Sequence, residues 1–127
     1  MREAAPRYDT AGYVTYDDYL RIEAEAEVRH EYVGGELYAL VGASLRHNEI
    51  TGQLYAALLP HVRAAGCRIF LLDTKLRVRN NVIYYPDLMV TCDPADSDPT
   101  VVARPCLVAE VLSSSTERTD LREKLIS

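Results

Sequence analysis

Two carboxylates stand within segments that are otherwise apolar. Asp87 lies in VIYYPDLMV and Glu110 lies in CLVAEVL, and each segment has the composition of a buried strand. A lone buried carboxylate is costly unless it is paired, protonated or bound to a cation. If the two strands are neighbours, the carboxylates can converge on one Mg²⁺ or Mn²⁺ ion, which prefers oxygen ligands. The alternative is a pair of strand-end carboxylates that reach solvent or pair with arginine.

A basic side chain could complete such a site. Cleavage of a phosphodiester needs a metal to polarise the phosphate and activate water, and it gains from a cation that stabilises developing charge. Lys124 is the candidate, because it lies four residues after Asp120 in a predicted C-terminal helix, so both side chains share one helix face. The alternative is a surface ion pair between these two residues, which contributes little.

A helix and a hairpin are predicted in the N-terminal third of the chain. Thr15, followed by Asp18 three residues later, is typical of a helix N-cap, and this helix should run to roughly Ala26. Gly34-Gly35 separates two short runs of tyrosine, valine and leucine, and glycine accepts positive φ. A tight hairpin is therefore expected, with strands at about 29–33 and 36–41.

A second helix and three strands should follow. Ser44 can cap a helix whose apolar residues recur at helical spacing, with a kink at Pro60 and an end at Gly66. Strands are then expected at 67–72, 74–79 and 82–90. Asn80-Asn81 is predicted to form a two-residue turn, because asparagine tolerates the left-handed region.

The C-terminal part should contain a loop, a strand and a helix. Prolines and aspartates indicate a loop over 92–105, and the spacing of Asp93, Asp96 and Asp98 fits no calcium-binding loop, so no metal site is predicted there. A buried strand is expected at 106–112. Ser115 or Thr116 then caps a final helix that reaches the chain end without a stop signal.

The length and composition predict one globular domain. The chain has 127 residues, of which 48% are hydrophobic and 26% charged, which excludes a disordered chain, a membrane span and a repeat protein. We expect a flexible segment over 1–13 and a single domain over 14–127. Because the last helix has no stop signal, this domain is expected to be incomplete at its C-terminus, unless the helix simply frays there.

Three cysteines, Cys67, Cys92 and Cys106, are an odd number without a C-x-x-C pair. Neither a disulfide framework nor a zinc knuckle is therefore expected, and a reducing, cytoplasmic setting fits better. The N-terminal residues carry early charge but no apolar run, so no secretory signal is predicted.

The charge is acidic overall but uneven. A net charge of −5 argues against a protein that coats nucleic acid non-specifically. Within 74–79, however, basic residues alternate with Leu76 and Val78, so one strand face is basic and the other apolar. That face could contact phosphates, although an ordinary solvated sheet face shows the same alternation. The basic residues of this face are Lys75, Arg77 and Arg79.

Several motifs together resemble one family. The order Pro86-Asp87, then Glu110 in VAEVLSSST, then Lys124 in DLREK is similar to that of the Uma-two-type family of putative restriction endonucleases. The N-terminal half agrees, because TYDDYL, RHEYVGGELYAL and SLRHNEI occur in the same order as in that family. The resemblance extends from about Val14 to Ile126.

The resemblance implies a fold and a metal site. The expected fold is α/β (α+β), a mixed β-sheet of the restriction-endonuclease, PD-(D/E)xK type flanked by helices. Asp87 and Glu110 would be ligands of Mg²⁺ (or Mn²⁺), and the backbone carbonyl of Val111 would be a further ligand. Leu112 occupies the position where the wider superfamily carries lysine. Lys124 in the following helix would therefore supply the catalytic cation.

Two further residues match motifs of the family. Glu36, just after the Gly-Gly turn, could add a metal contact or orient water. His47, in the first turn of the second helix, could contact phosphate or carry a proton near neutral pH. The alternatives are an ordinary strand-end carboxylate for Glu36, and a helix cap or solvent-facing residue for His47.

The expected function is metal-dependent cleavage of DNA in the cytoplasm, with no membrane association. A homodimer is expected at the level of the family, because cutting both strands takes two sites. One alternative is a non-catalytic, nuclease-like domain used for binding or assembly. Another is a hydrolase of small phosphate esters, which would share the ligands and differ in the shape of its pocket.

Overall fold

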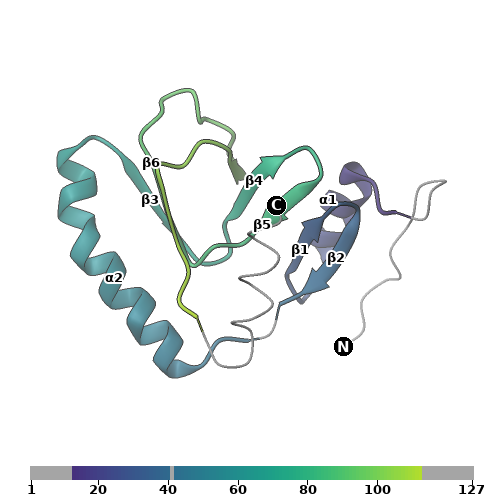
Figure 1. The fold of residues 1–127 in the computed structure, drawn as a ribbon, viewed down its shortest axis with the longest axis horizontal. Coiled ribbons are helices and arrows are strands. Elements are labelled where there is room, and N and C mark those ends of the chain that lie inside the picture. Colours follow the sequence, from purple (N-terminus) through teal and green to yellow (C-terminus); the bar gives the residue numbers. More distant parts are fainter. Residues whose placement is uncertain (1–12, 41, 113–127) are drawn as a thin grey trace. The chain divides into compact units, whose positions relative to one another are not determined.

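The protein forms two compact units. The computed structural model describes residues 13–40 and 42–112 (Figure 1). The first unit comprises Met1–Gly42 and Arg77–Tyr84, and the second comprises Ala43–Leu76 and Tyr85–Ser127.

A helix and a hairpin build the first unit, as predicted. Helix α1 (Tyr16–Glu25) begins after Thr15, whose side chain accepts a hydrogen bond from the backbone N–H of Asp18 at 3.2 Å. Strands β1 (His30–Val33) and β2 (Glu36–Ala39) pair antiparallel around Gly34 and Gly35. The φ angles of these glycines are 59° and 91°, so the turn uses the conformation that glycine accepts most readily.

Tyrosines and a buried contact between a glutamate and a histidine hold α1 on β1. The rings of Tyr19 and Tyr32 stack with centroids 4.8 Å apart, and the Tyr19 hydroxyl donates to the carbonyl of His30 at 2.8 Å. Glu23 is 7% exposed; its Oε2 accepts the backbone N–H of His30 at 2.7 Å and its Oε1 lies 3.0 Å from Nδ1 of the same residue. Strand β5 (Val82–Tyr84) extends the sheet by pairing antiparallel with β1.

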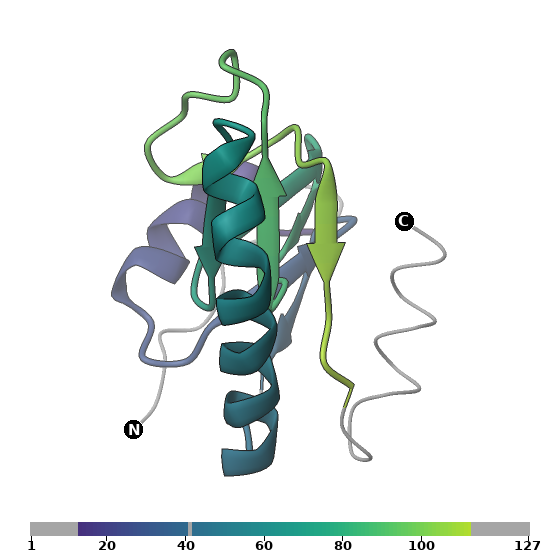
Figure 2. The ribbon, with the colours of Figure 1, turned by 90° about the vertical axis from the view of Figure 1, so that its left-hand side faces the viewer.

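The second unit consists of a helix packed on a three-stranded sheet. Strand β6 (Leu88–Thr91) lies between β3 (Arg68–Leu71) and β8 (Leu107–Ala109), and both pairings are antiparallel. Helix α2 (Leu45–Ala64) lies along one face of this sheet (Figure 2). The shared core contains the buried side chains Val62, Leu88 and Val90, with Leu54, Leu58 and Ile69 packed against them.

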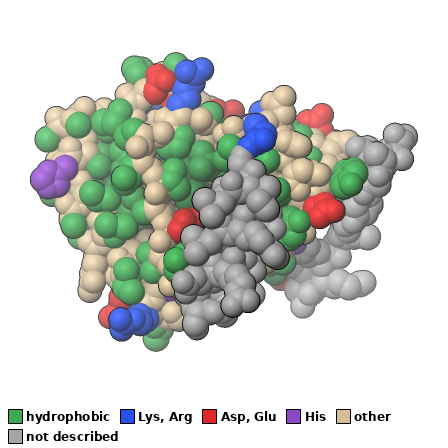
Figure 3. Space-filling view, in the orientation of Figure 1, with side chains coloured by type: hydrophobic (Ala, Val, Ile, Leu, Met, Phe, Trp, Pro, Cys, Tyr) green, Lys and Arg blue, Asp and Glu red, His purple; other side chains and the backbone are tan. Residues whose placement is uncertain are grey.

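The other face of β6 is covered as well. Strand β7 (Val101–Val102) pairs in parallel with the start of β4 (Lys75–Arg79), and the buried side chains Leu76, Met89 and Val102 form a second core with Phe70. All four residues of β6 are consequently buried. The outer strand β8 is less covered, because Leu107 and Val108 are 42% and 44% exposed. Figure 3 shows apolar side chains gathered on the viewed face of this unit.

The structure corrects one strand prediction. The expected strand over 82–90 is two strands, β5 and β6, which belong to different sheets. Pro86 stands at the break, and proline lacks the N–H that a continuous strand would donate and restricts the residue before it. Asp87 is thus the residue that precedes β6 rather than the middle of a strand.

Smaller differences concern the turns and the C-terminal part. The segment predicted as a loop over 92–105 contains β7, and the strand predicted over 106–112 is limited to Leu107–Ala109. Asn80 and Asn81 form the turn between β4 and β5, as predicted. They do not use the left-handed conformation, because Asp73 is the non-glycine residue with positive φ in the described ranges. Gly66 ends α2 with a φ of 73°, as expected. The predicted final helix lies outside the described residues.

The expectation that the cysteines form no disulfide framework is also corrected. Cys67 and Cys92 form a disulfide, and Cys106 is an exposed thiol. The cause is the strand register: Arg68 lies opposite Thr91 in the β3/β6 pair, so the next residues outward are the two cysteines. Single-sequence spacing cannot reveal such a cross-strand pair, since the two residues are separated by 25 positions.

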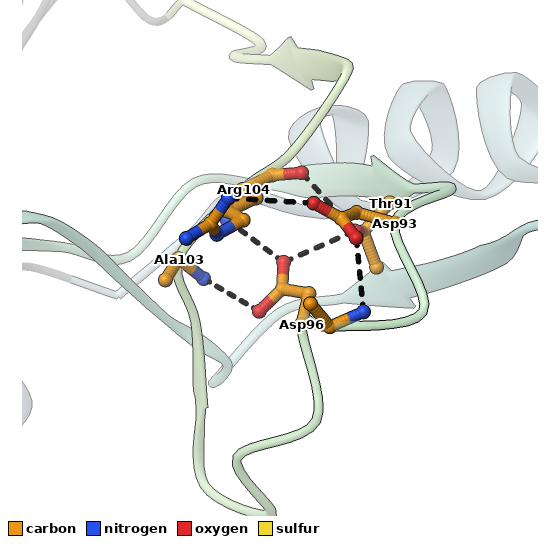
Figure 4. A network of polar contacts seen from close by, with 6 residues as sticks. Thr91, Asp93, Asp96, Ala103 and Arg104 are labelled. Carbon is orange, nitrogen blue, oxygen red and sulfur yellow. Dashed lines mark hydrogen bonds and ion pairs between the residues drawn. The ribbon is translucent and has the colours of Figure 1, made fainter.

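Asp96 anchors the chain between β6 and β8. Its carboxylate accepts hydrogen bonds from the backbone N–H groups of Ala103 and Arg104, at 2.9 and 2.8 Å, and from the Thr91 hydroxyl at 3.0 Å (Figure 4). Burial raises the pKa of this carboxyl, but these hydrogen bonds and the nearby charge of Arg68 outweigh burial and lower the pKa below its ordinary value. The predicted loop therefore has a charged, fully bonded anchor.

We predict that Asp96→Asn destabilises the protein by about 1–3 kcal/mol at pH 7. The amide nitrogen of asparagine cannot accept hydrogen bonds from the N–H groups that the carboxylate binds. A carboxyl whose folded pKa is lowered stabilises the fold above its unfolded pKa, and this stabilisation is lost as the pH falls through the folded pKa. Urea unfolding at pH 7 and in acid measures both effects. If the difference in free energy of unfolding between wild type and variant did not become smaller in acid, the role assigned to the Asp96 carboxylate would be contradicted.

Candidate active site at the ends of β6 and β8

The two carboxylates singled out by the sequence come from neighbouring strands. Leu88 of β6 lies opposite Ala109 of β8 in the antiparallel register, so the next pair outward is Asp87 and Glu110. Residues directly opposite in an antiparallel pair place their side chains on the same face, about 5 Å apart at Cβ. The condition for a shared cation, that the two strands be neighbours, is therefore met.

Asp87 is buried and held by two hydrogen bonds. The residue is 9% exposed, and its Oδ2 accepts the backbone N–H of Val111 at 2.7 Å. The same oxygen lies 3.0 Å from Nε2 of His47. Both described bonds fall on Oδ2, so they orient the carboxylate without using its second oxygen.

Helix α2 supplies His47 through its N-terminal cap. The Ser44 hydroxyl accepts the backbone N–H of His47 at 3.0 Å, which places the imidazole on the first turn of the helix, next to the start of β6. An ionised carboxylate can only accept, so Nε2 of His47 must carry the proton that it shares with Asp87. Its Nδ1 is buried and has no hydrogen-bond partner among the residues that the structure describes.

Val111 enters the cluster through its backbone N–H. Sequence reasoning assigned its carbonyl as a metal ligand, and the bond from its N–H to Asp87 was not foreseen. No sequence signal could have revealed this bond, because any residue except proline carries the same group. The bond fixes the orientation of the Asp87 carboxylate. Glu110, the preceding residue, is half-buried.

The donors suit a hard cation. Within residues 13–40 and 42–112, no three acidic, histidine or cysteine side chains are grouped to hold a metal by themselves. Mg²⁺ does not need such a cage, because it is commonly bound by one or two carboxylates, with water and substrate phosphate completing the shell. Asp87, Glu110 and the carbonyl of Val111 provide oxygen donors of that kind. The residues present therefore fit Mg²⁺ or Mn²⁺.

The two other predicted catalytic residues, Glu36 and Lys124, are not among the described residues of the second unit. Glu36 belongs to the first unit, where it is exposed and its Oε1 accepts the Tyr38 hydroxyl at 3.0 Å. Lys124 and its predicted helix partner Asp120 lie outside the described residues. The cluster that the structure brings together consists of Asp87, His47 and Val111, with Glu110 in the facing position.

The three basic residues of β4 differ in their surroundings. The guanidinium of Arg77 lies over the ring of Tyr16, 4.0 Å from its centroid, and donates to Oδ1 of Asn80 at 3.3 Å. This cation–π contact commits Arg77 to the first unit. Arg79 is exposed, whereas Lys75 is half-buried at the start of the strand. The strand is therefore not a uniformly solvated basic surface.

None of the helices in the described part of the chain is both long and apolar enough to span a membrane.

Comparisons with known proteins point to one family. The family model Uma2, described as "Putative restriction endonuclease", matches residues 16–127. Two uncharacterised proteins of Synechocystis sp. are similar: slr1290 is 40% identical over 106 residues, covering 82% of this chain and 56% of that protein. The second, sll1609, is 33% identical over 119 residues, covering 91% of this chain and 67% of that protein. The chain thus spans between about half and two thirds of the length of these relatives.

A solved structure shares the fold. It is the crystal structure of a putative nuclease belonging to DUF820 from Anabaena variabilis, with a TM-score of 0.70 and 19% identity. The match covers 89% of this chain and 66% of that chain. The predicted fold class, a mixed α/β (α+β) nuclease-like fold, is thereby confirmed, and its strands divide into two sheets.

We predict that His47 and Asp87 are energetically coupled. In a double-mutant cycle with His47→Ala and Asp87→Ala, the free energies of unfolding should differ from additivity by about 0.5–3 kcal/mol, because the two side chains are in direct contact. His61→Ala offers a matched control, since His61 is an exposed histidine of the same helix. A His47/Asp87 pair that is additive within about 0.5 kcal/mol in urea unfolding would contradict the contact.

Proposed function

The chain belongs to the Uma2 family of putative restriction endonucleases, and from this premise we propose that it hydrolyses phosphodiester bonds of DNA with Mg²⁺ or Mn²⁺. The observation that carries the proposal is the buried Asp87, opposite Glu110, with a carboxylate oriented by His47 and Val111. A buried carboxylate next to a second, half-buried one is unfavourable for folding unless a cation neutralises the charge. A catalytic metal ion supplies that cation.

Asp87 and Glu110 would hold the metal ion together with the carbonyl of Val111. When bound, such an ion polarises the scissile phosphate and lowers the pKa of a water molecule. His47 is a positioning residue in this scheme: its Nε2–H fixes Oδ2 of Asp87, which leaves the second oxygen for the cation. Its buried Nδ1 supports a further role, since a substrate hydroxyl or water could donate to it.

Lys124 completes the proposed site. Lys124 would stabilise the charge that develops on the phosphate, because the position two residues after Glu110 is Leu112 and offers no cation. Of the basic residues on β4, Lys75 and Arg79 are the better candidates for DNA phosphates, because Arg77 is engaged with Tyr16. A homodimer in the cytoplasm is part of the same proposal.

Nicking of supercoiled plasmid tests the activity. At low salt with Mg²⁺ or Mn²⁺, wild type should cleave, EDTA should abolish cleavage, and Asp87→Asn should reduce the rate at least about 10²-fold, since a metal ligand contributes several kcal/mol at the transition state. Asp98→Asn is the matched control, because Asp98 is an exposed carboxylate that caps Thr100 in the same unit. This variant should cleave like wild type.

Two results would overturn the nuclease proposal. One is a folded wild type that does not cleave under these conditions; if it still binds DNA in a gel-shift assay, a non-catalytic binding domain explains the fold instead. The other is cleavage that survives in Asp87→Asn. Competition between DNA and a chromogenic phosphodiester distinguishes a nuclease from a hydrolase of small phosphate esters, because only the nuclease should be inhibited strongly by DNA.

Replacing each of the chain's two lysines should have a different effect. Lys124→Ala should lower the cleavage rate with little effect on DNA affinity, because the proposed role of Lys124 is confined to the transition state. Lys75→Ala should weaken DNA binding and reduce the salt dependence of binding. The cleavage rate at saturating DNA should be unchanged, because a phosphate contact acts equally in the bound ground state and in the transition state. Single-turnover cleavage and filter binding separate the two effects. Unchanged metal-dependent cleavage in Lys124→Ala would remove this residue from the site.

A further inference from the structure

Three cysteines meet at the end of β6 that lies away from Asp87. Cys92 directly follows β6 and is joined by a disulfide to Cys67, which directly precedes β3. Cys106, which directly precedes β8, has its Sγ 3.5 Å from the Sγ of Cys92. The three residues therefore sit at adjacent strand ends, with Cys92 in the middle.

Backbone pairing holds the two outer cysteines beside β6. The β3/β6 register places Cys67 opposite Cys92, one step beyond the pair Arg68 and Thr91. On the other side, the backbone N–H of Cys106 donates to the carbonyl of Val90 at 2.8 Å. Each outer sulfur thus reaches Cys92 from a separately fixed strand, and neither depends on the other.

We propose that the three cysteines form a thiol–disulfide exchange site. The thiolate of Cys106 attacks Sγ of Cys92, and a Cys92–Cys106 bond forms as the Cys67–Cys92 bond breaks. Cys67 leaves as the thiolate and takes up the proton that Cys106 released, so no oxidant or reductant is consumed. Because Cys92 and Cys106 are both exposed, small thiols and disulfides can reach the pair from solution.

Exchange would change which segments are cross-linked. The Cys67–Cys92 disulfide ties the junction between α2 and β3 to β6. A Cys92–Cys106 disulfide would instead close the segment 93–105 at its base. That segment is already drawn together by Asp96, which accepts hydrogen bonds from Thr91, Ala103 and Arg104. The contacts that hold Cys106 near Cys92 therefore do not depend on the existing disulfide.

Single serine variants test whether both disulfides can form. After air oxidation, Cys106→Ser should form Cys67–Cys92 and Cys67→Ser should form Cys92–Cys106, each losing both remaining free thiols in a thiol assay and on intact mass. Cys92→Ser is the control: it lacks the sulfur common to both bonds and should keep two reactive thiols. Two free thiols in Cys67→Ser, alongside full oxidation of Cys106→Ser, would overturn the proposal.

A measurement on the wild-type chain does not depend on how the variants fold. The oxidised protein is incubated with a limiting amount of an alkylating reagent and mapped by non-reducing peptide mass spectrometry. Exchange predicts that label appears on both Cys106 and Cys67, with the matching disulfide found in each case. Label confined to Cys106, with Cys67–Cys92 the sole disulfide at all times, would refute exchange.

Discussion

The burial of β6 on both faces is the constraint on which the second unit depends. Residues 88–91 are all buried, between α2 on one side and the Leu76, Met89 and Val102 core on the other. A strand in this position cannot carry an unsatisfied polar group, so polar residues at its two ends must find partners in the protein. Asp87 precedes the strand, and Thr91 with Cys92 closes it. The hydrogen bonds of Asp87 and Thr91 follow from this placement, whereas Cys92, the next residue, is exposed.

Two buried carboxylates near β6 differ in how completely they are hydrogen-bonded. Asp96 uses both oxygens for three hydrogen bonds, and its lowered pKa reflects a charge that the surrounding N–H groups satisfy. Asp87 receives two described bonds on one oxygen only, and the residue opposite it in the strand register, Glu110, is a second carboxylate. The first arrangement is complete without a ligand and suits an anchor. The second gains from a cation, which is why the chemistry is assigned to Asp87.

Local signals predicted much of the fold, and the misses have a common cause. The caps at Thr15 and Ser44, the glycine turn and the end of α2 at Gly66 each depend on a few adjacent residues, and the structure has them where the sequence indicated. The division of 82–90 into two strands, the short β7 and the Cys67–Cys92 disulfide depend on pairing between distant segments. Composition and periodicity do not encode such pairing. In the site, residue types pointed to Asp87 and Glu110, and the resemblance to the family pointed to His47, whereas the N–H of Val111 carried no signal.

Cys92 lies at the opposite end of β6 from Asp87, and this has a consequence for the site. Because Cys92 is common to both disulfides of the proposed exchange, β6 stays cross-linked in either state, and the buried strand that positions Asp87 is never released. What changes is the partner strand, from β3 to β8. Strand β8 leads directly into Glu110, just as Asp87 directly precedes β6. A Cys92–Cys106 bond would therefore link β6 and β8 at one end, and the two carboxylates lie at the other end of the same pair.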